Sequence, residues 1–222
     1  MQAIPPKDLI CMNSLSQENG FEVDLVYAQA DHPENMFGEA IYRKTAQFWL
    51  HKTLANITLL AAREAQERHG WTLILKDGLR PFEAQEAIAQ TRICRANPQW
   101  FQEPRMFSPP GKGGHPRGMA VDVDARHESG SLIDFGTPFD TMAEDPSPLL
   151  NRSHRDYKDF SADVLKNRDK LTALFVDSAQ KLNLPMAPLS VEWWDYRFPV
   201  DFYNQYSPVH DKDLPEDMRM LP

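Results

Sequence analysis

The chain has 222 residues, 41% of them hydrophobic and 25% charged, and its formal net charge is −8 at pH 7. This length and apolar content predict a single domain, residues 1–222, that buries a core of its own. The negative charge, without any run of Lys or Arg, argues against a nucleic acid or a membrane as partner. No apolar stretch approaches the roughly 20 residues of a membrane-spanning helix, so we expect a soluble protein.

The chain has two cysteines, Cys11 and Cys94, which are too few for a disulfide framework and too far apart for a CxxC metal motif. A metal site would therefore have to use histidines and carboxylates. Residues 1–20 lack the basic and apolar segments of a secretory signal, which favours the cytoplasm, or the periplasm if a signal has been removed. The sequence leaves the oligomeric state open, and a homo-oligomer is compatible with it.

In the first half of the chain, the spacing of apolar residues and the positions of glycine and proline predict two helices with a strand between them. Apolar residues recur at helical intervals over 45–69, and a glycine follows the last of them. The β-rich stretch 71–78 is typical of a strand, and Pro81 suits the start of a second helix over 81–96. Prolines and glycines make 97–118 a long loop that should be functional or mobile.

In the second half, acids alternate with apolar residues over 119–125, which is the period of a strand with one apolar face. Residues 167–184 have the spacing of another amphipathic helix, and 188–198 read as the last strand. We expect the core over about 35–198, with 199–222 as an acidic, proline-rich surface tail. The order of elements predicts an α+β fold with a small antiparallel sheet flanked by helices.

His115 and Asp122, seven residues apart, are the first candidates for chemistry. The histidine ends a glycine-rich loop, the acid lies on a predicted strand, and both are ligand types that Zn²⁺ accepts. Taken alone, the pair is more often a surface or hydrogen-bonding pair. Between them, however, Gly118 and Ala120 are small, as needed where a strand passes close to a filled site. Asp122 also lies between two valines, where an acid should be paired or bound to metal.

Glu192 and Asp195 flank two tryptophans in the predicted last strand, SVEWWDYRF. Residues three apart on a regular strand point to opposite faces, so both acids reach one site only if the backbone bends there. Two interpretations follow. The acids are solvated on an edge strand, or Asp195 binds a metal and Glu192 acts as general base beside it.

Arg80 stands in a turn directly before Pro81, where its guanidinium could be directed at a carboxylate or an oxyanion. Pairing with Asp77 at the surface is the simpler interpretation of that arginine. Asp134 and Asp140 bracket a tight turn, DFGTPFD, and turn formation by itself explains one of the two.

Six motifs in this order, spread over about 35–198, resemble the D-alanyl-D-alanine dipeptidases of the VanX type, a group of zinc peptidases. Together they are far more specific than any one of them. In chain order the motifs are FGxxxY at 37–42, DGLRP at 77–81, HPRGMAVD at 115–122, DFGTPFD at 134–140, RSH at 152–154 and EWW at 192–194.

The resemblance implies one catalytic Zn²⁺ in a confined pocket and a small dipeptide, such as D-Ala-D-Ala, as the partner. By the family pattern, His115 and Asp122 are zinc ligands and Glu192 is the acid/base. Arg80 would stabilise the oxyanion. The residues expected to contact the substrate are Asp140, through the free amino group, Tyr42 from the first motif, and Trp194 as a wall of the pocket.

Two positions depart from the family pattern: Gly113 replaces a serine, and Asp195 replaces the histidine that is the third zinc ligand. Three interpretations of Asp195 are open. It binds the metal itself, which would favour oxygen-preferring ions such as Mn²⁺. Alternatively, His154 or His210 takes its place. In the third, the metal is lost or weakly held, and the protein binds small amino-acid-like ligands. A related amidase or peptidase acting on another cell-wall-derived amide is a further alternative.

Overall fold

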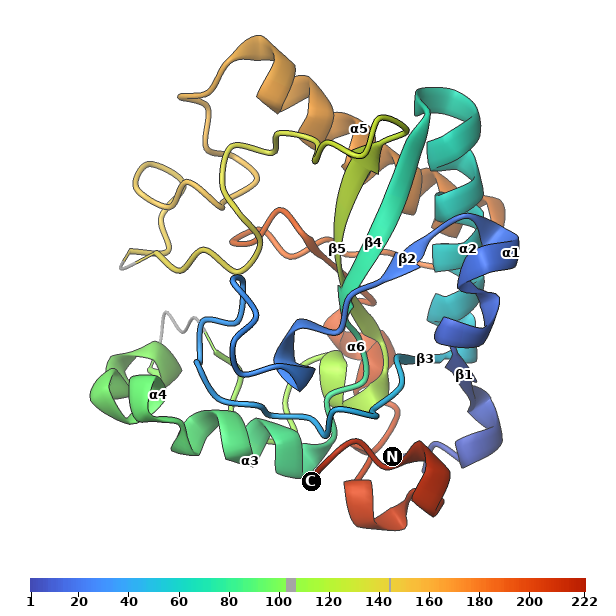
Figure 1. Cartoon of the computed structure of the whole chain (residues 1–222), viewed down its shortest axis with the longest axis vertical. Helices are drawn as coiled ribbons and strands as arrows, with labels where there is room; N and C mark the ends of the chain where they lie inside the picture. The colour runs from blue at the N-terminus through green and yellow to red at the C-terminus, as the bar shows by residue number, and fades with distance from the viewer. Residues whose placement is uncertain (103–106, 144) are drawn as a thin grey trace.

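The computed structural model describes residues 1–102, 107–143 and 145–222. Its centre is a four-stranded sheet in the order β2-β4-β5-β6, and a separate two-stranded sheet pairs β1 with β3 (Figure 1). The strands are β1 (Leu9–Cys11), β2 (Glu22–Val23), β3 (Trp49–His51), β4 (Trp71–Asp77), β5 (Ala120–His127) and β6 (Asp195–Arg197). The helices are α1 (Ser16–Asn19), α2 (Lys52–His69), α3 (Phe82–Gln90), α4 (Arg92–Ala96), α5 (Ala162–Lys181) and α6 (Val200–Tyr203).

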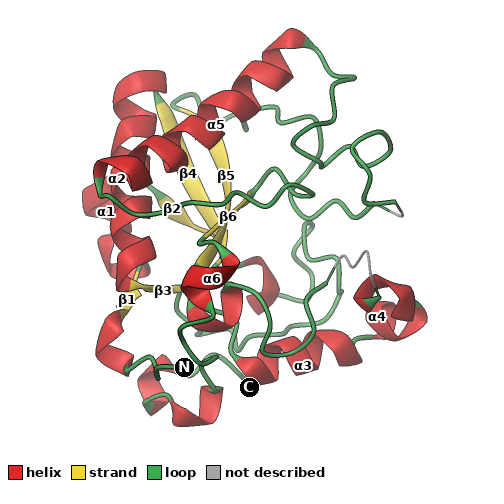
Figure 2. Cartoon of the chain, turned by 180° about the vertical axis from the view of Figure 1, so that it is seen from behind, coloured by secondary structure: helices red, strands yellow, loops and turns green. Residues whose placement is uncertain are grey.

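The predicted antiparallel sheet is confirmed for two of the three strand pairings in the four-stranded sheet. Strand β5 pairs antiparallel with β4 on one side and with β6 on the other, whereas the short edge strand β2 runs parallel to β4. The long helices α2 and α5 pack together along one side of the sheet, as Figures 1 and 2 show from opposite directions. Loops, with α3 and α4 beyond them, lie on the other side, so β4 and β5 are buried along most of their length.

Helix α2 begins later than the apolar spacing predicts. Residues 49–51, at the start of the expected helix, form strand β3 instead, because they pair with β1 from the beginning of the chain. The His51 side chain then caps α2 by accepting a hydrogen bond from Thr53 N at 3.3 Å. At the other end Gly70 adopts φ +62° and donates to the carbonyls of Ala65 and Gln66, the glycine stop that the sequence predicts.

The helix expected over 81–96 is divided into α3 and α4 at Thr91. Thr91 has an extended backbone, and its hydroxyl accepts a hydrogen bond from Cys94 N at 3.4 Å, which starts the second helix. Helix α5 confirms the amphipathic segment predicted over 167–184, with an earlier start at Ala162. Within the predicted loop 97–118, residues 103–106 lie outside the described residues.

The expectation of a surface tail over 199–222 is wrong. Met220 is fully buried, and its N–H and C=O bond Asp211 and Arg43, respectively. Val209 bonds the backbone of Pro116 and Phe82, next to the segments that carry the predicted site. The composition of this stretch is polar, but its few apolar residues fill gaps in the core. The N-terminal residues before 35 also contribute buried side chains, so the core extends beyond 35–198 on both sides.

Among the described residues, no helix combines the length and the apolar character that crossing a membrane would require.

Candidate active site

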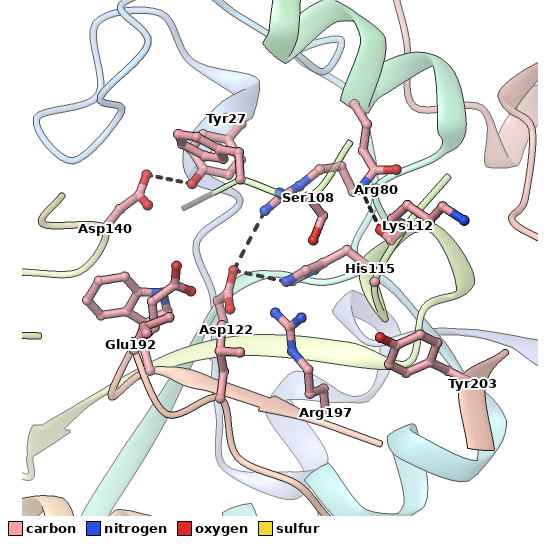
Figure 3. A pocket seen from close by; sticks show the side chains of 16 residues that line it. Tyr27, Arg80, Ser108, Lys112, His115, Asp122, Asp140, Glu192, Arg197 and Tyr203 are labelled. Carbon is pink, nitrogen blue, oxygen red and sulfur yellow. Dashed lines mark hydrogen bonds and ion pairs between the residues drawn. The ribbon is translucent and has the colours of Figure 1, made fainter. Parts of the chain in front are cut away.

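A cavity of about 230 Å³ opens beside the ends of β4, β5 and β6. Figure 3 shows that its charged side chains point toward one another from separate parts of the chain. The sequence-predicted residues that line it are Arg80, His115, Asp122, Asp140, Glu192 and Trp194.

Three aspartates form a row across the sheet beneath this cavity. Asp77 on β4 is in register with Asp122 on β5, and Asp122 is in register with Asp195 on β6. A register shift between residues 75 and 77 brings Asp77 into this row. Directly opposed residues on neighbouring strands have Cβ atoms only ~5 Å apart, and like charges there repel. Because all three side chains are buried, the row requires cations between its members.

Arg80 supplies the first cation. Its Nε and Nη2 donate to Asp77 Oδ2 at 2.9 and 2.6 Å, and Nη2 lies 3.8 Å from Asp122 Oδ2. The guanidinium also lies 5.6 Å from the ring centre of Tyr27. The pairing with Asp77 that the sequence offered as a surface interaction is thus a buried one, and it fixes the guanidinium at the cavity wall.

His115 supplies the second cation. Its Nδ1 lies 2.8 Å from the carbonyl oxygen of Gly78, to which it donates, and Nε2 faces Asp122 Oδ2 at 3.5 Å and Asp195 Oδ2 at 3.2 Å. Burial opposes a charged ring, but the carboxylates of Asp122 and Asp195 raise the pKa of His115 to about 10. Positive charge between these two carboxylates is therefore strongly favoured, whether a proton or a metal ion provides it.

Arg197 supplies the third cation, and sequence reasoning missed it. Its Nε donates to Asp195 Oδ1 at 2.6 Å and its Nη2 donates to Asp195 Oδ2. This bidentate contact and His115 hold the pKa of Asp195 well below its usual range, although burial acts in the opposite direction. The signal was present in the sequence, because an acid and an arginine two residues apart on a strand share one face.

The donors beneath the cavity fit a divalent metal ion. His115 presents Nε2 while its Nδ1 is held by a backbone carbonyl, which is the usual arrangement of a metal-binding imidazole. Asp122 Oδ1 is buried without a hydrogen-bond partner among the described residues. Ligand atoms of Asp77, His115 and Asp122 lie within 4.8 Å of one another, and Asp195 Oδ2 faces the same imidazole nitrogen. Because Asp195 is shared with Arg197, it would be the weakest of these donors for a metal ion.

A second group of metal-ligating types, formed by Asp24, His32 and Glu34, has a different explanation. Lys76 places its ammonium 2.8 Å from Asp24 Oδ2 and 2.6 Å from Glu34 Oε2, and only 4% of its side chain is exposed. The lysine supplies the counter-charge for this group, and it also accounts for a buried lysine on strand β4.

Glu192 reaches the cavity because it is not part of a strand. Only residues 195–197 of the predicted last strand pair with β5, and Glu192 lies in the bend before them. The conflict between its position and that of Asp195 is thereby removed. Burial, followed by the charges of Asp195 and Asp122, raises the pKa of Glu192 to about 8. A carboxyl group with a pKa near neutrality is suited to both taking up and giving back a proton.

Asp140 lies on the opposite side of the cavity from His115 (Figure 3). It is a non-glycine residue in the left-handed region, with φ 58°, and Tyr27 donates a hydrogen bond of 2.6 Å to its Oδ2. Burial raises the pKa of Asp140 to about 7, against the effect of the Tyr27 hydrogen bond. Among the described residues no basic side chain forms an ion pair with Asp140, and a strained backbone with such a carboxylate at a cavity wall is expected of a ligand-binding position. Asp134, at the start of the same turn, bonds Gly136 N and serves the turn alone.

The sequence also predicts that Trp194 and Tyr42 contact the substrate, and the structure places only Trp194 at the cavity. Trp194 lines the cavity, with Phe139 packed edge-on against it at 5.5 Å. Tyr42 does not line it. Its hydroxyl donates to Asp77 Oδ1 at 2.8 Å from a fully buried position, so it supports the carboxylate that holds Arg80 and does not contact a ligand directly.

Neither histidine proposed as a replacement for Asp195 reaches the site. His154 Nδ1 accepts a hydrogen bond from the N–H of Asp156 at 2.9 Å, and His210 Nδ1 lies 3.0 Å from Glu83 Oε1. Neither ring lines the cavity. The interpretation in which another histidine completes the site is therefore wrong.

Comparison with known proteins decides the family. The sequence profile of the D-Ala-D-Ala dipeptidase family matches residues 14–213. The chain belongs to this family. A D-alanyl-D-alanine dipeptidase of Escherichia coli K12 is 32% identical over 179 residues, which cover 80% of this chain and 79% of the relative. One from Enterococcus faecium is 28% identical over 153 residues, covering 63% of this chain and 68% of the relative. The resemblance drawn from six motifs is confirmed, and the chain is a hydrolytic enzyme of this dipeptidase family.

Proposed function

We propose that the protein hydrolyses small dipeptides with D-configured residues, D-Ala-D-Ala first among them. The observation that carries this proposal is the convergence of Glu192, His115 and Asp122 in one cavity. A proton-transferring carboxyl stands there beside donors that fit a divalent ion, which is the combination that amide hydrolysis by activated water requires. The names of the two relatives support the same substrate.

The size and charge of the cavity support a dipeptide in preference to a longer chain. About 230 Å³ is small beside the ~300–1,000 Å³ of ordinary ligand pockets. Asp140 offers a carboxylate at one end, where the free ammonium of a dipeptide can bind. An additional residue at that end would place a neutral peptide group against the buried carboxylate and lose this pairing.

In the proposed hydrolysis, the charged residues of the cavity have separate roles. Glu192 accepts the proton of the attacking water and delivers it to the leaving amine. Arg80, fixed by Asp77, donates to the oxyanion that forms at the attacked carbonyl. Held by His115, Asp122 and Asp195, a bound divalent ion would polarise that carbonyl and lower the pKa of the water. We propose Zn²⁺ as this ion, with Mn²⁺ favoured more than usual because two of the three donors are carboxylates.

A cytoplasmic location is part of the proposal. The structure leaves Cys11 and Cys94 as free thiols, which agrees with a reducing compartment.

The proposal is tested with protein stripped of metal by a chelator and then reloaded with Zn²⁺ or Mn²⁺. The reloaded protein should cleave D-Ala-D-Ala in preference to L-Ala-L-Ala and to a D-Ala tripeptide. Glu192→Gln should lower kcat at least about a thousandfold with bound metal unchanged. Glu67→Gln, an exposed position on α2, is the matched control and should retain full activity. Full activity of Glu192→Gln, or no cleavage of any dipeptide by the reloaded protein, would overturn the proposal.

A further inference from the structure

Only two of the three guanidinium nitrogens of Arg197 donate to Asp195. Nε and Nη2 make the bidentate contact, while Nη1 has no hydrogen-bond partner among the described residues. The side chain is 15% exposed, and this exposed part faces the cavity, which Arg197 helps to line. Figure 3 shows its guanidinium directed from β6 toward the same space as the His115 ring. One edge of a fixed, charged donor is thus available to a ligand.

The space beside Gly113 lies within reach of this free edge. Gly113 has φ +87° and no side chain, and a Cβ placed on it would lie 3.2 Å from Ser108 Oγ and 3.7 Å from Arg197 Nη1. The Ser108 hydroxyl and the Arg197 guanidinium therefore lie near each other beside Gly113, and all three residues line the cavity. An anionic oxygen bound in the cavity between these two groups could accept a hydrogen bond from each, whereas a ligand without an acceptor there would leave Nη1 without a partner.

The cavity is also polarised along its length, as Figure 3 shows. His115 and Asp122 occupy the middle. One end carries carboxylates and the other end carries donors, so a zwitterion fits in one orientation only. The carboxylate end consists of Asp140 and Glu192, and the donor end consists of Ser108, Lys112 and Arg197.

We propose that Arg197 is a specificity residue that binds a carboxylate on the C-terminal residue of the substrate, with the Ser108 hydroxyl as second donor. This inference rests on the proposed dipeptide hydrolysis and names the group that the donor end of the cavity recognises. Arg197 then has two functions: Nε and Nη2 hold Asp195 in the row of acids, and Nη1 orients the substrate. The bound carboxylate is either the α-carboxylate or an acidic side chain of the same residue.

The test compares three substrates: D-Ala-D-Ala, its C-terminal amide, and D-Ala-D-Glu with an amidated α-carboxyl group. For the wild type, kcat/KM should be at least about tenfold higher for the free acid than for the alanyl amide, since a charge-assisted hydrogen bond is lost. Arg197→Gln should bring this ratio close to one. Restored cleavage of the D-Glu amide would identify a side-chain carboxylate as the ligand, and failure to restore it would identify the α-carboxylate.

A purely structural role of Arg197 predicts a different result. Loss of support for Asp195 would lower kcat/KM for acid and amide alike and leave their ratio unchanged. Ser108→Ala provides an independent variant, because the described hydrogen bonds of the Asp195 carboxylate come from His115 and Arg197 and not from Ser108. It should reduce the ratio about threefold or more with kcat retained, while Ser131→Ala, on an exposed turn, should leave the ratio unchanged. An unchanged ratio in both Ser108→Ala and Arg197→Gln would overturn the inference.

The failure of this inference is distinguishable from the failure of the proposed function. Equal cleavage of all three substrates by the wild type, the D-Glu amide included, would exclude the carboxylate site and leave dipeptide hydrolysis intact. If no dipeptide is cleaved, the proposed function fails, and calorimetric binding of the same acid and amide to the Glu192→Gln variant still compares the two ligands. Tighter binding of the acid by about tenfold would support the site, and equal binding would reject it.

Discussion

Arg197 binds both carboxylate oxygens of Asp195, its neighbour two residues back on the same face of strand β6. This aspartate, at the position where the sequence resemblance leads us to expect a histidine, is therefore neutralised by its own strand. A histidine at this position would be neutral and would need no such partner. The two residues form one unit, so substitutions at Asp195 and Arg197 should have non-additive effects on stability.

Asp195→His alone should destabilise the metal-free protein. The variant leaves Arg197 largely buried without its partner, so the free energy of unfolding should fall by about 3 kcal/mol. Adding Arg197→Leu removes the stranded charge and should recover most of this loss. Urea unfolding of the two single variants and the double variant gives the coupling energy. Strictly additive effects would show that the two residues do not act as a unit.

The same double variant should bind Zn²⁺ more tightly than the wild type does. Its third ligand is an imidazole that no arginine occupies, and imidazole is a preferred zinc ligand. Competition with a chromophoric chelator measures the affinity at fixed pH. Weaker zinc binding by the double variant would mean that the site depends on carboxylate geometry at residue 195.

Tyr27→Phe should change how activity depends on pH. Burial raises the pKa of Asp140 to about 7, even though the Tyr27 hydrogen bond lowers it. Without it the carboxyl group ionises at higher pH, so the acidic limb of kcat/KM should move upward by about one unit, and KM near neutral pH should rise. Tyr42→Phe removes a hydroxyl that bonds Asp77 instead, and it should lower kcat without moving that limb. Unchanged pH profiles in Tyr27→Phe would separate Asp140 from substrate binding.

Asp124→Asn should make stability less dependent on pH. Burial raises the pKa of Asp124 from 3.8 to about 6, so between these values the folded protein holds a proton that the unfolded chain releases. The wild type therefore loses stability as the pH rises through this range, by an amount on the order of 2 kcal/mol. Denaturant unfolding at pH 4 and pH 7 should show the variant gaining relative to the wild type at the higher pH. An equal difference at both values would show that Asp124 has an ordinary pKa in the folded state.

Gly118→Ala should destabilise the protein more than Gly70→Ala does. Both glycines have φ +62°, but a Cβ at Gly118 would lie 2.8 Å from the backbone nitrogen of His51, whereas Gly70 has nothing within 4 Å. Gly70→Ala should cost about 1 kcal/mol for the left-handed backbone alone. Gly118→Ala adds a clash with backbone that cannot move aside, and about 2 kcal/mol more is expected. Thermal unfolding of the two variants checks this, and equal losses would contradict the close approach.

Sequence patterns predicted a structural element correctly where that element depends only on the residues of its own segment. The glycine stop of α2, the strand that ends at Asp77 and the acid-bearing strand around Asp122 follow from turn chemistry and alternation. Contacts between segments that are distant in the sequence could not be predicted from such local patterns. Residues 49–51 look helical by themselves and become a strand because β1 lies next to them, and the polar tail after 199 is held by backbone contacts with segments before it.

The family and the residue types of the site follow from the amino-acid sequence alone, because six short motifs in a fixed order carry that information. The same motifs indicate Asp195 as the position where the chain departs from the family pattern. What this departure means depends on how the strands pair. Asp77, Asp122 and Asp195 come from three strands, and their register places them in one row that needs a cation beside each member. Arg197 is that cation for Asp195. The three aspartates lie far apart in the sequence, and their like charges become unfavourable only when folding brings them together out of water.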